Sequence, residues 1–246
     1  MKPFIEDIEK FTSEKFPDLE IQKGALYIVS TPIGNMEDIS FRALFILKNS
    51  DIIAAEDTRV TNNLLKHYGI QKRVISYYSK VENTKINFII SELKKNKAVA
   101  LVSDAGTPCI SDPGNLLVSR CIEEGIEIFS IPGASALIHS LVLSGLPNER
   151  FYFQGFLPQK KGREKTFNEL KKKKMTLIIY ESKYRIKKTL KECLKYFDNK
   201  EVSVGRELTK KFEENVRMSL KELNSNLNVI KEKGEFVIII NNNQKS

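Results

Sequence analysis

Along residues 25–145, the pattern of apolar and polar residues alternates several times between that of a strand and that of a helix. Apolar residues recur at helical spacing near 84–96 and 114–124, among other segments, and this spacing predicts helices. Short apolar runs rich in β-branched residues predict strands at about 27–30, 52–55, 74–77, 98–102 and 126–131. Because strands and helices alternate, we expect an α/β domain with a mostly parallel sheet and helices on both faces.

Two helices of this region carry signals at their ends. Ser40 stands before the apolar positions of a helix that contains Phe41 and Leu47, and a serine side chain there caps free backbone N–H groups. Another helix, with Leu64 on its apolar face, is expected to end at Gly69, because glycine favours the left-handed conformation that stops helices. Both helices therefore fall between predicted strands.

The pattern changes after a helix that contains Ala136 and Leu141 and ends at 145–147, a Gly-Leu-Pro sequence where we expect a domain boundary. Beyond it the sequence predicts strands at about 151–153, 176–180, 201–204 and 236–240, with helices at about 163–173 and 184–196. We therefore expect an N-terminal extension at 1–24, an α/β domain at 25–146, an α+β domain with a mixed sheet at 147–241 and a polar tail at 242–246.

Small and turn-forming residues follow four predicted strands of the first domain. The longest of these loops runs from Ser103 to Gly114, and the others lie at 31–35, 56–59 and 132–136. Glycine allows close backbone approach to a ligand, and Ser, Asp and Thr supply short-range hydrogen bonds. Because loops at the carboxyl ends of parallel strands meet at one edge of a sheet, the four loops predict a composite ligand site.

Composition narrows the class of protein. With 41% hydrophobic and 29% charged residues, the chain reads as soluble and globular, and no apolar run approaches the length of a membrane span. Acidic residues in the first two dozen positions argue against a signal peptide, so we expect a cytoplasmic protein. Its cysteines (Cys109, Cys121 and Cys193) and histidines (His67 and His139) lack metal-ligand spacing, so we expect reduced thiols and no metal site.

Several common chemical signatures are missing from the sequence. There is no P-loop, no G-x-G-x-x-G after the first strand, no H-E-x-x-H and no nucleophile elbow. Phosphoryl transfer, dinucleotide redox chemistry and common hydrolase chemistry are therefore disfavoured. Loops of Gly, Pro, Ala, Ser and Thr instead suit a small molecule that is held mainly by backbone groups.

Charge is unevenly distributed along the chain. Residues 1–150 carry a formal charge of −2 and residues 151–246 carry +11, which together give the net +9. Such a basic half is typical of proteins that bind a polyanion, most often nucleic acid, although lysines on a solvated helix face give the same pattern. The basic residues that we expect to contact the nucleic acid are Lys160, Lys161, Arg163, Lys165, Arg185 and Arg206.

The loop sequences resemble a known family. The segments 26–40, 54–59, 103–114 and 131–136, followed by 150–158, 180–182, 206–210 and 234–237, are similar to the tetrapyrrole (corrin/porphyrin) methylase superfamily. Within it they resemble the branch that methylates small-subunit ribosomal RNA. The resemblance covers about residues 25–241. Each segment alone is weak, but their number, order and spacing make chance agreement implausible.

The resemblance implies S-adenosylmethionine-dependent 2′-O-methylation of a cytidine in the decoding region of small-subunit (16S) ribosomal RNA. It also implies a homodimer, with the cofactor folded into the cleft between the domains. By motif match, the implied cofactor-binding residues are Pro32, Ile33, Gly34, Ser103, Asp104, Ala105, Gly106, Thr107, Pro108, Ile110, Pro132, Gly133, Ser135, Ala136, Tyr180 and Glu181.

Methyl transfer to a ribose hydroxyl needs the nucleophile in line with the methyl group, and a group that takes or orients the hydroxyl proton. The candidates at the carboxyl edge are Glu56, Asp57, Arg59 and Asp104. We take Asp57 as a candidate base, with the alternative that Asp57 and Thr58 cap the next helix. Tyr77, Tyr78 and Tyr184 are candidates for stacking on a splayed base, with core or sheet packing as the alternative.

This sequence departs from the family pattern at several places. Ala134 stands where Pro is common, 183–184 is Lys-Tyr where Pro-His is common, and 77–80 lacks the usual His/Glu-rich composition. Apart from these differences, two other functions remain open. One is methylation of a tetrapyrrole, against which the basic second half argues, and the other is a nonenzymatic RNA-binding assembly factor.

Overall fold

The computed structural model describes residues 20–243 and divides the chain into two compact units, Met1–Ser135 and Ala136–Ser246. The expected extension at 1–24 and the expected tail at 242–246 lie largely outside the described residues. The sequence pattern placed a boundary after 145–147, but helix α6 (Ala136–Ser144) is grouped with the second unit, because it packs on strands of that unit.

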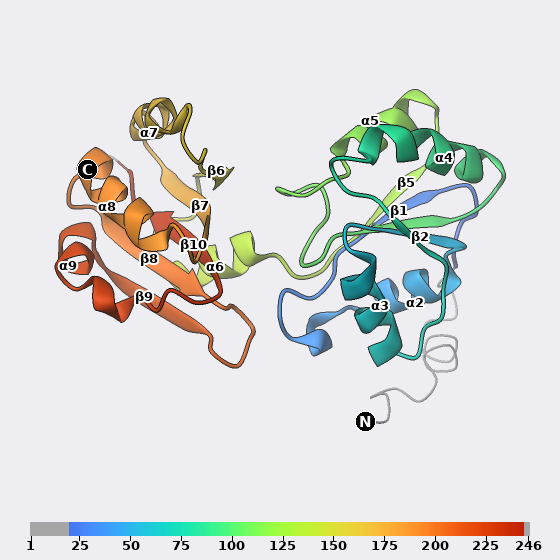
Figure 1. Ribbon diagram of the computed structural model, residues 1–246, viewed down its shortest axis with the longest axis horizontal. Helices are drawn as coiled ribbons and strands as arrows, with labels where there is room; N and C mark the ends of the chain where they lie inside the picture. The colour runs from blue at the N-terminus through green and yellow to red at the C-terminus, as the bar shows by residue number, and fades with distance from the viewer. Residues whose placement is uncertain (1–19, 244–246) are drawn as a thin grey trace. The chain divides into compact units, whose positions relative to one another are not determined.

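The first unit is built on a five-stranded parallel sheet with the order β3-β2-β4-β1-β5 (Figure 1). Its strands are β1 (Leu26–Val29), β2 (Ile52–Ala55), β3 (Val74–Ser76), β4 (Val99–Val102) and β5 (Ile128–Ile131). The central strands are buried on both faces, and their sequences are continuous apolar runs. Such runs are typical of parallel strands that are covered by helices on both sides. The predicted parallel α/β architecture is confirmed.

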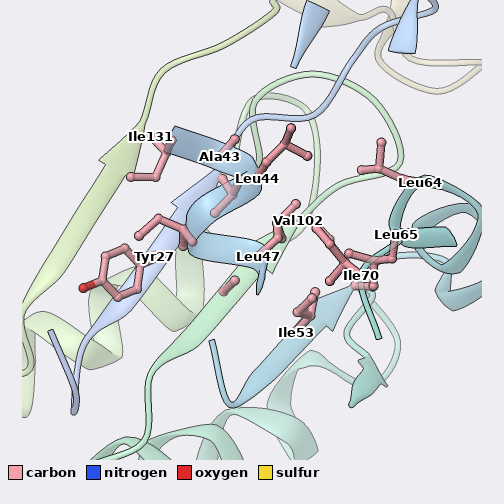
Figure 2. Packing of buried hydrophobic residues seen from close by; sticks show 14 of the residues in the cluster. Tyr27, Ala43, Leu44, Leu47, Ile53, Leu64, Leu65, Ile70, Val102 and Ile131 are labelled. Carbon is pink, nitrogen blue, oxygen red and sulfur yellow. The ribbon is translucent and has the colours of Figure 1, made fainter. Parts of the chain in front are cut away.

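Helices cover both faces of this sheet (Figure 1). They are α2 (Phe41–Asn49), α3 (Thr58–His67), α4 (Glu82–Lys94) and α5 (Asn115–Glu123), with a short 3₁₀ turn η1 (Met36–Asp38) before α2. On one face, α2 and α3 bury Leu44, Leu47 and Leu64 against Tyr27 and Ile53 (Figure 2). On the other face, α4 and α5 form a second cluster with the sheet. The two clusters bury both faces of the sheet, and the loops that form the candidate site start from the ends of these packed strands.

The predicted helix ends of this unit are confirmed. The Ser40 hydroxyl accepts a hydrogen bond from the Ala43 backbone N–H at 3.1 Å and caps α2. Gly69, just after α3, has a φ of 67°, the left-handed conformation that glycine adopts without strain. Such local signals are readable from sequence because the groups that make them are close along the chain.

The second unit has a mixed sheet with the order β6-β7-β10-β8-β9. Its strands are β6 (Phe151–Phe156), β7 (Thr176–Ser182), β8 (Glu201–Arg206), β9 (Glu214–Ser219) and β10 (Glu235–Ile240). Only the β6/β7 pair is parallel, and the other pairs are antiparallel. Helices α7 (Arg163–Lys171), α8 (Ile186–Phe197) and α9 (Leu220–Ser225) contribute to its main core, and the 3₁₀ turn η2 (Leu227–Val229) follows α9. The predicted α+β class with a mixed sheet is confirmed.

Helix α6 packs against β8 and β10 of this sheet. Gly205 on β8 makes the close approach possible, because a Cβ there would lie 2.9 Å from the Ser140 hydroxyl of α6. An added methyl would therefore push the helix away from the sheet.

The sequence did not predict β9 or α9. Strand β9 reads Glu-Asn-Val-Arg-Met-Ser and lies at the edge of the sheet, where polar residues are tolerated and discourage pairing with other chains. Within residues 20–243, no helix has both the length and the apolar character needed to cross a membrane.

Candidate active site

The loops after β1, β2, β4 and β5 lie next to one another at the carboxyl edge of the first sheet, because these strands are adjacent and parallel. Thr31 and Gly106 exchange two backbone hydrogen bonds, of 2.9 and 3.0 Å. The Thr107 hydroxyl lies 2.9 Å from the Ser30 hydroxyl and donates to the Ala134 carbonyl at 3.3 Å. The structure thus joins the loops that the sequence predicted to meet.

Close backbone approach shapes this edge. A Cβ at Gly133 would lie 2.7 Å from the Ser30 Cβ, and a Cβ at Gly106 would meet the Ile33 side chain at 3.3 Å. Gly106 also has a φ of 83°, which glycine adopts without strain. Glycine at these two positions therefore lets the loops after β1, β4 and β5 pack together with backbone groups at the surface of the site.

The loop at 103–114 contains backbone conformations that side chains disfavour. Cys109 has a φ of 70° and Ser111 a φ of 66°, although neither is glycine. Strained residues of this kind are concentrated at ligand and active sites, where the surrounding structure holds them in place. The loop is therefore held in a defined conformation.

Three carboxyl groups of this edge have raised pKa values. Burial, together with the Asp104 carboxylate, raises the pKa of Glu56, and partial burial also raises the pKa of Asp104. Burial and the carboxylates of Glu56 and Asp104 raise the pKa of Asp112 to about 7. Groups with pKa values near neutrality suit proton transfer at neutral pH. Asp112 lies inside the loop that the sequence singled out, but no sequence pattern showed that its carboxyl group would be buried beside two others.

Asp57 has a different environment from these three carboxyl groups. Its side chain caps α3 by accepting from the Arg59 backbone N–H at 2.8 Å, and it is ion-paired with the Arg59 guanidinium at 2.5 Å. These hydrogen bonds from Arg59 lower the pKa of Asp57 to about 2. The Asp57 backbone N–H also donates to the Asp104 carboxylate at 2.9 Å. The capping role that the sequence left as an alternative is therefore present.

Tyr180 and Glu181 lie on β7 of the second unit. The Tyr180 hydroxyl accepts a hydrogen bond from the Leu137 backbone N–H at 3.0 Å, near the start of α6 at Ala136. The Glu181 carboxylate is fully buried, accepts from the Thr189 hydroxyl at 2.7 Å, and is ion-paired with Arg185 at 2.8 Å. The Glu181 carboxylate therefore already has partners within its own unit.

The arginines that the sequence offered for RNA contact are occupied inside the second unit. Arg163 is 6% exposed, and its guanidinium is ion-paired with Glu192 at 2.7 Å. Arg206 is 7% exposed and is ion-paired with Glu214 at 3.0 Å, and Arg185 is half-buried against Glu181. These three side chains hold loops and helices of the unit together.

The lysines that the sequence offered are exposed. Lys160 and Lys161 precede α7, and Lys165 exposes 82% of its side chain on that helix. An open hollow along this helix is lined by Lys160, Gly162, Glu164, Lys165, Asn168, Glu169 and Lys172. Of the six basic residues that the sequence offered, the exposed ones are therefore lysines, which bind phosphate as point charges.

The tyrosines differ in exposure. Tyr77 is fully buried and donates a hydrogen bond to Glu82, so the core-packing alternative holds for it. Tyr78 is 39% exposed and Tyr184 is 84% exposed. Within the described residues, no group of three His, Cys, Asp or Glu side chains is arranged to hold a metal ion.

Comparison with known proteins agrees with this fold and loop arrangement. The family model described as Tetrapyrrole (Corrin/Porphyrin) Methylases matches residues 25–224. A solved structure of a cobalt precorrin-4 methyltransferase is similar with a TM-score of 0.65 and 18% identity, over 88% of this chain and 94% of that one. Uroporphyrin-III C-methyltransferase from Thermus thermophilus, solved in complex with S-adenosylhomocysteine, gives a TM-score of 0.61 and 18% identity, over 87% of this chain and 96% of that one. These two likenesses concern the fold, which is that of a methylase of this class.

More similar relatives carry the name ribosomal RNA small subunit methyltransferase I. The protein of that name from Halalkalibacterium halodurans is 49% identical over 90% of this chain and 77% of its own length. Those from Thermotoga maritima and Bacillus subtilis are each 43% identical over 88% of this chain, and over 98% and 75% of their own lengths. The chain therefore belongs to the tetrapyrrole methylase family and, within it, to the ribosomal RNA small subunit methyltransferase I family.

Proposed function

We propose that this protein uses S-adenosylmethionine to methylate the ribose 2′-hydroxyl of a cytidine in the decoding region of small-subunit ribosomal RNA. The observation that carries the proposal is the 49% identity, over 90% of the chain, to a protein named ribosomal RNA small subunit methyltransferase I. The joined loops of the first unit and the basic second half of the chain support it.

The first unit has features that fit the cofactor. Its loops present small residues and backbone groups, and glycine at positions 106 and 133 lets these loops pack closely against one another. Within the first unit, we assign cofactor contact to residues 32–34, 103–108 and 110, and to Pro132, Gly133 and Ser135. S-adenosylmethionine supplies an electrophilic methyl group when it is bound.

The side chains at the carboxyl edge have distinct proposed roles. Asp112, with a pKa of about 7, accepts the proton of the attacking hydroxyl, with Glu56 and Asp104 beside it. Asp57, with a pKa of about 2, is the weaker base at neutral pH, and its proposed role is to hold Asp104 and the start of α3. Arg59 is ion-paired with Asp57 but exposes 87% of its side chain, and its proposed role is to contact a phosphate of the substrate.

We assign RNA contact in the second unit to Lys160, Lys161 and Lys165, and stacking on a splayed base to Tyr184. Exposed lysines attract the phosphate backbone, and exposed aromatic rings stack on unpaired bases. Arg163 and Arg206 are left out of this assignment because their donors are used within the unit. We further propose that the protein is cytoplasmic and forms a homodimer, and light scattering on the purified chain tests the homodimer.

The direct test is transfer of labelled methyl from S-adenosylmethionine to small ribosomal subunits purified from a strain that lacks the protein. Mass spectrometry then identifies the modified nucleoside. We expect 2′-O-methylcytidine. Labelling of a tetrapyrrole but not of RNA would indicate the related small-molecule activity, and RNA binding without binding of the cofactor would indicate an assembly factor.

A further inference from the structure

A buried glutamate outside the proposed chemistry contacts the longest loop of the site. Glu82, in the first turn of α4, is 9% exposed. Its Oε1 atom accepts a hydrogen bond of 2.7 Å from the Tyr77 hydroxyl and another of 3.0 Å from the Gly114 backbone N–H. Burial and the hydrogen bond to Glu82 raise the pKa of Tyr77, so Tyr77 stays a neutral donor. One carboxylate oxygen thus joins the segment after β3 to the end of the 103–114 loop.

Burying a carboxylate is costly, so its environment must compensate. Among the described residues, no lysine, arginine or histidine forms an ion pair with Glu82. Its partners are instead two N–H or O–H donors, one of which is the Gly114 N–H at the N-terminus of α5. The positive end of a helix dipole favours a carboxylate in that place. The buried Glu82 carboxylate therefore needs the Gly114 N–H as a donor, and the loop end at Gly114 needs Glu82 as its acceptor.

The loop is held at both ends. At its start, Gly106 exchanges two backbone hydrogen bonds with Thr31, and at its end Gly114 donates to Glu82. Gly114 has a φ of 134°, and a Cβ there would lie 2.6 Å from the Cys109 sulfur, so the turn is tightly closed. Between the two anchors, Cys109 and Ser111 are held in left-handed conformations that they disfavour. Without the anchor at Gly114 this segment would relax.

We propose that Glu82, with Tyr77 as its partner, is a positioning residue that fixes the 106–114 segment and so sets cofactor affinity and the position of Asp112. This inference rests on the proposed function, since it takes the loop to be part of the cofactor site. Helices α4 and α5 themselves are packed by apolar side chains that include Ile89 and Leu117. Tyr77 belongs to the same apolar cluster, so Glu82 links that cluster to the loop end at Gly114.

Three variants of the full chain separate the parts of the contact. Glu82→Gln keeps an acceptor oxygen for both donors. Glu82→Leu removes both hydrogen bonds, and Tyr77→Phe removes one and leaves the bond to Gly114. Ile89→Ala is the matched control, because it removes fully buried apolar atoms from the same helix and leaves both hydrogen bonds of Glu82 in place.

The readouts are the dissociation constant of S-adenosylhomocysteine by calorimetry, the thermal unfolding midpoint, and amide hydrogen exchange of residues 106–114 in the free protein. We expect Glu82→Leu to weaken binding about tenfold, which is the effect of losing one hydrogen bond to a charged group. The same variant should speed amide exchange in the loop. Glu82→Gln should stay within about twofold of the native chain, with Tyr77→Phe between the two. Ile89→Ala should lower the midpoint and leave binding unchanged.

The proposal is overturned if Glu82→Leu lowers the unfolding midpoint but leaves both loop exchange and binding at native values. It is also overturned if Ile89→Ala weakens binding as much as Glu82→Leu does. If the native chain fails to bind S-adenosylhomocysteine, the proposed function fails together with the effect of Glu82 on affinity. Faster loop exchange in Glu82→Leu alone would then still establish that Glu82 fixes the loop.

Discussion

At the scale of single residues, Asp112 is the carboxyl group at the carboxyl edge of the first sheet whose pKa is raised furthest above its ordinary value. Its pKa of about 7 follows from burial and from the neighbouring carboxylates of Glu56 and Asp104. The three groups come from two loops, since Glu56 follows β2 whereas Asp104 and Asp112 follow β4, so the full effect exists only once the sheet has brought these loops together. Function at this edge is therefore expected to depend on pH near neutrality.

Replacing Asp112 by Asn tests its proposed role as proton acceptor. Native methyl transfer should rise with pH through about 7 as the Asp112 carboxylate forms, and Asp112→Asn should lose this rise and about two orders of magnitude in rate. Initial rates with small ribosomal subunits between pH 5.5 and 9 measure this. Glu123→Gln, at an exposed position near the end of α5, is the control and should keep the native profile.

The same substitution checks the cause of the pKa shift through stability. Because the Asp112 pKa is higher in the folded chain than its ordinary value of 3.8, the stability it contributes is complete below about pH 4 and is lost as pH rises through about 7. Asp112→Asn should therefore unfold at a higher temperature than the native chain at pH 8, with a smaller difference at pH 5. A difference that does not change with pH would contradict the pKa assignment.

The sequence alone could not distinguish basic side chains that are exposed from those that are buried in ion pairs. Lys160 and Arg163 both belong to the basic run and look alike in sequence. In the structure Lys160 is exposed, whereas Arg163 donates to Glu192, Thr189 and the Pro158 carbonyl. These partners are far from Arg163 in sequence or lie in the backbone, so no local pattern shows whether its charge faces solvent or the interior.

Arg163→Ala should therefore destabilise the second unit. We expect a loss of about 3 kcal/mol in the free energy of unfolding, because the buried Glu181 and partly buried Glu192 would lose a compensating charge. Urea unfolding measures this loss. Lys165→Ala, on the exposed face of the same helix, should change stability by less than about 0.5 kcal/mol. Equal effects of the two substitutions would contradict the buried network.

At the scale of elements, strand periodicity and helix caps were readable, because each depends on neighbours in sequence. The positions of the site loops followed from the strand alternation, since parallel strands bring their carboxyl ends to one edge. What the sequence could not show was how closely the loops approach one another. Gly133 lies against Ser30, and the φ values of Cys109 and Ser111 are set by long-range anchors.

Gly133→Ala tests the packing of these elements. The added methyl would lie 2.7 Å from the Ser30 Cβ and should force the loops after β1 and β5 apart, weakening S-adenosylhomocysteine binding by tenfold or more in calorimetry. Gly125→Ala is a matched control. Its φ of 66° imposes strain of about 1 kcal/mol, but a methyl there meets no other atom. Gly125→Ala should lower stability and leave binding unchanged, and a Gly133→Ala chain that binds normally would contradict the account.

At the scale of the whole molecule, the two parts of the chain carry net charges of opposite sign. The first 150 residues carry −2 and the remaining 96 carry +11. Ion pairs within the second unit use some of this positive charge, including that of Arg163 and Arg206, and lysines before and along α7 remain exposed. Affinity for RNA should therefore depend on exposed lysines and decrease as salt is added.

The triple substitution of Lys160, Lys161 and Lys165 by Ala tests this dependence. We expect weaker binding to small-subunit RNA and a slope of log affinity against log salt that is smaller by about 2, since each lost phosphate contact lowers it by about 0.7 to 0.9. Fluorescence anisotropy over a salt series measures the slope. Triple substitution of Lys23, Lys66 and Lys95, which are exposed in the first unit, changes the net charge equally and should leave the slope near its native value.

The central claim is that the methyl group goes to a ribose oxygen, and alkaline digestion of the methylated RNA tests it most directly. A 2′-O-methyl group removes the hydroxyl that attacks the adjacent phosphodiester bond, so label from S-adenosylmethionine should remain in an alkali-resistant dinucleotide whose first residue is cytidine. Label recovered in mononucleotides would place the methyl group on a base and would contradict the account.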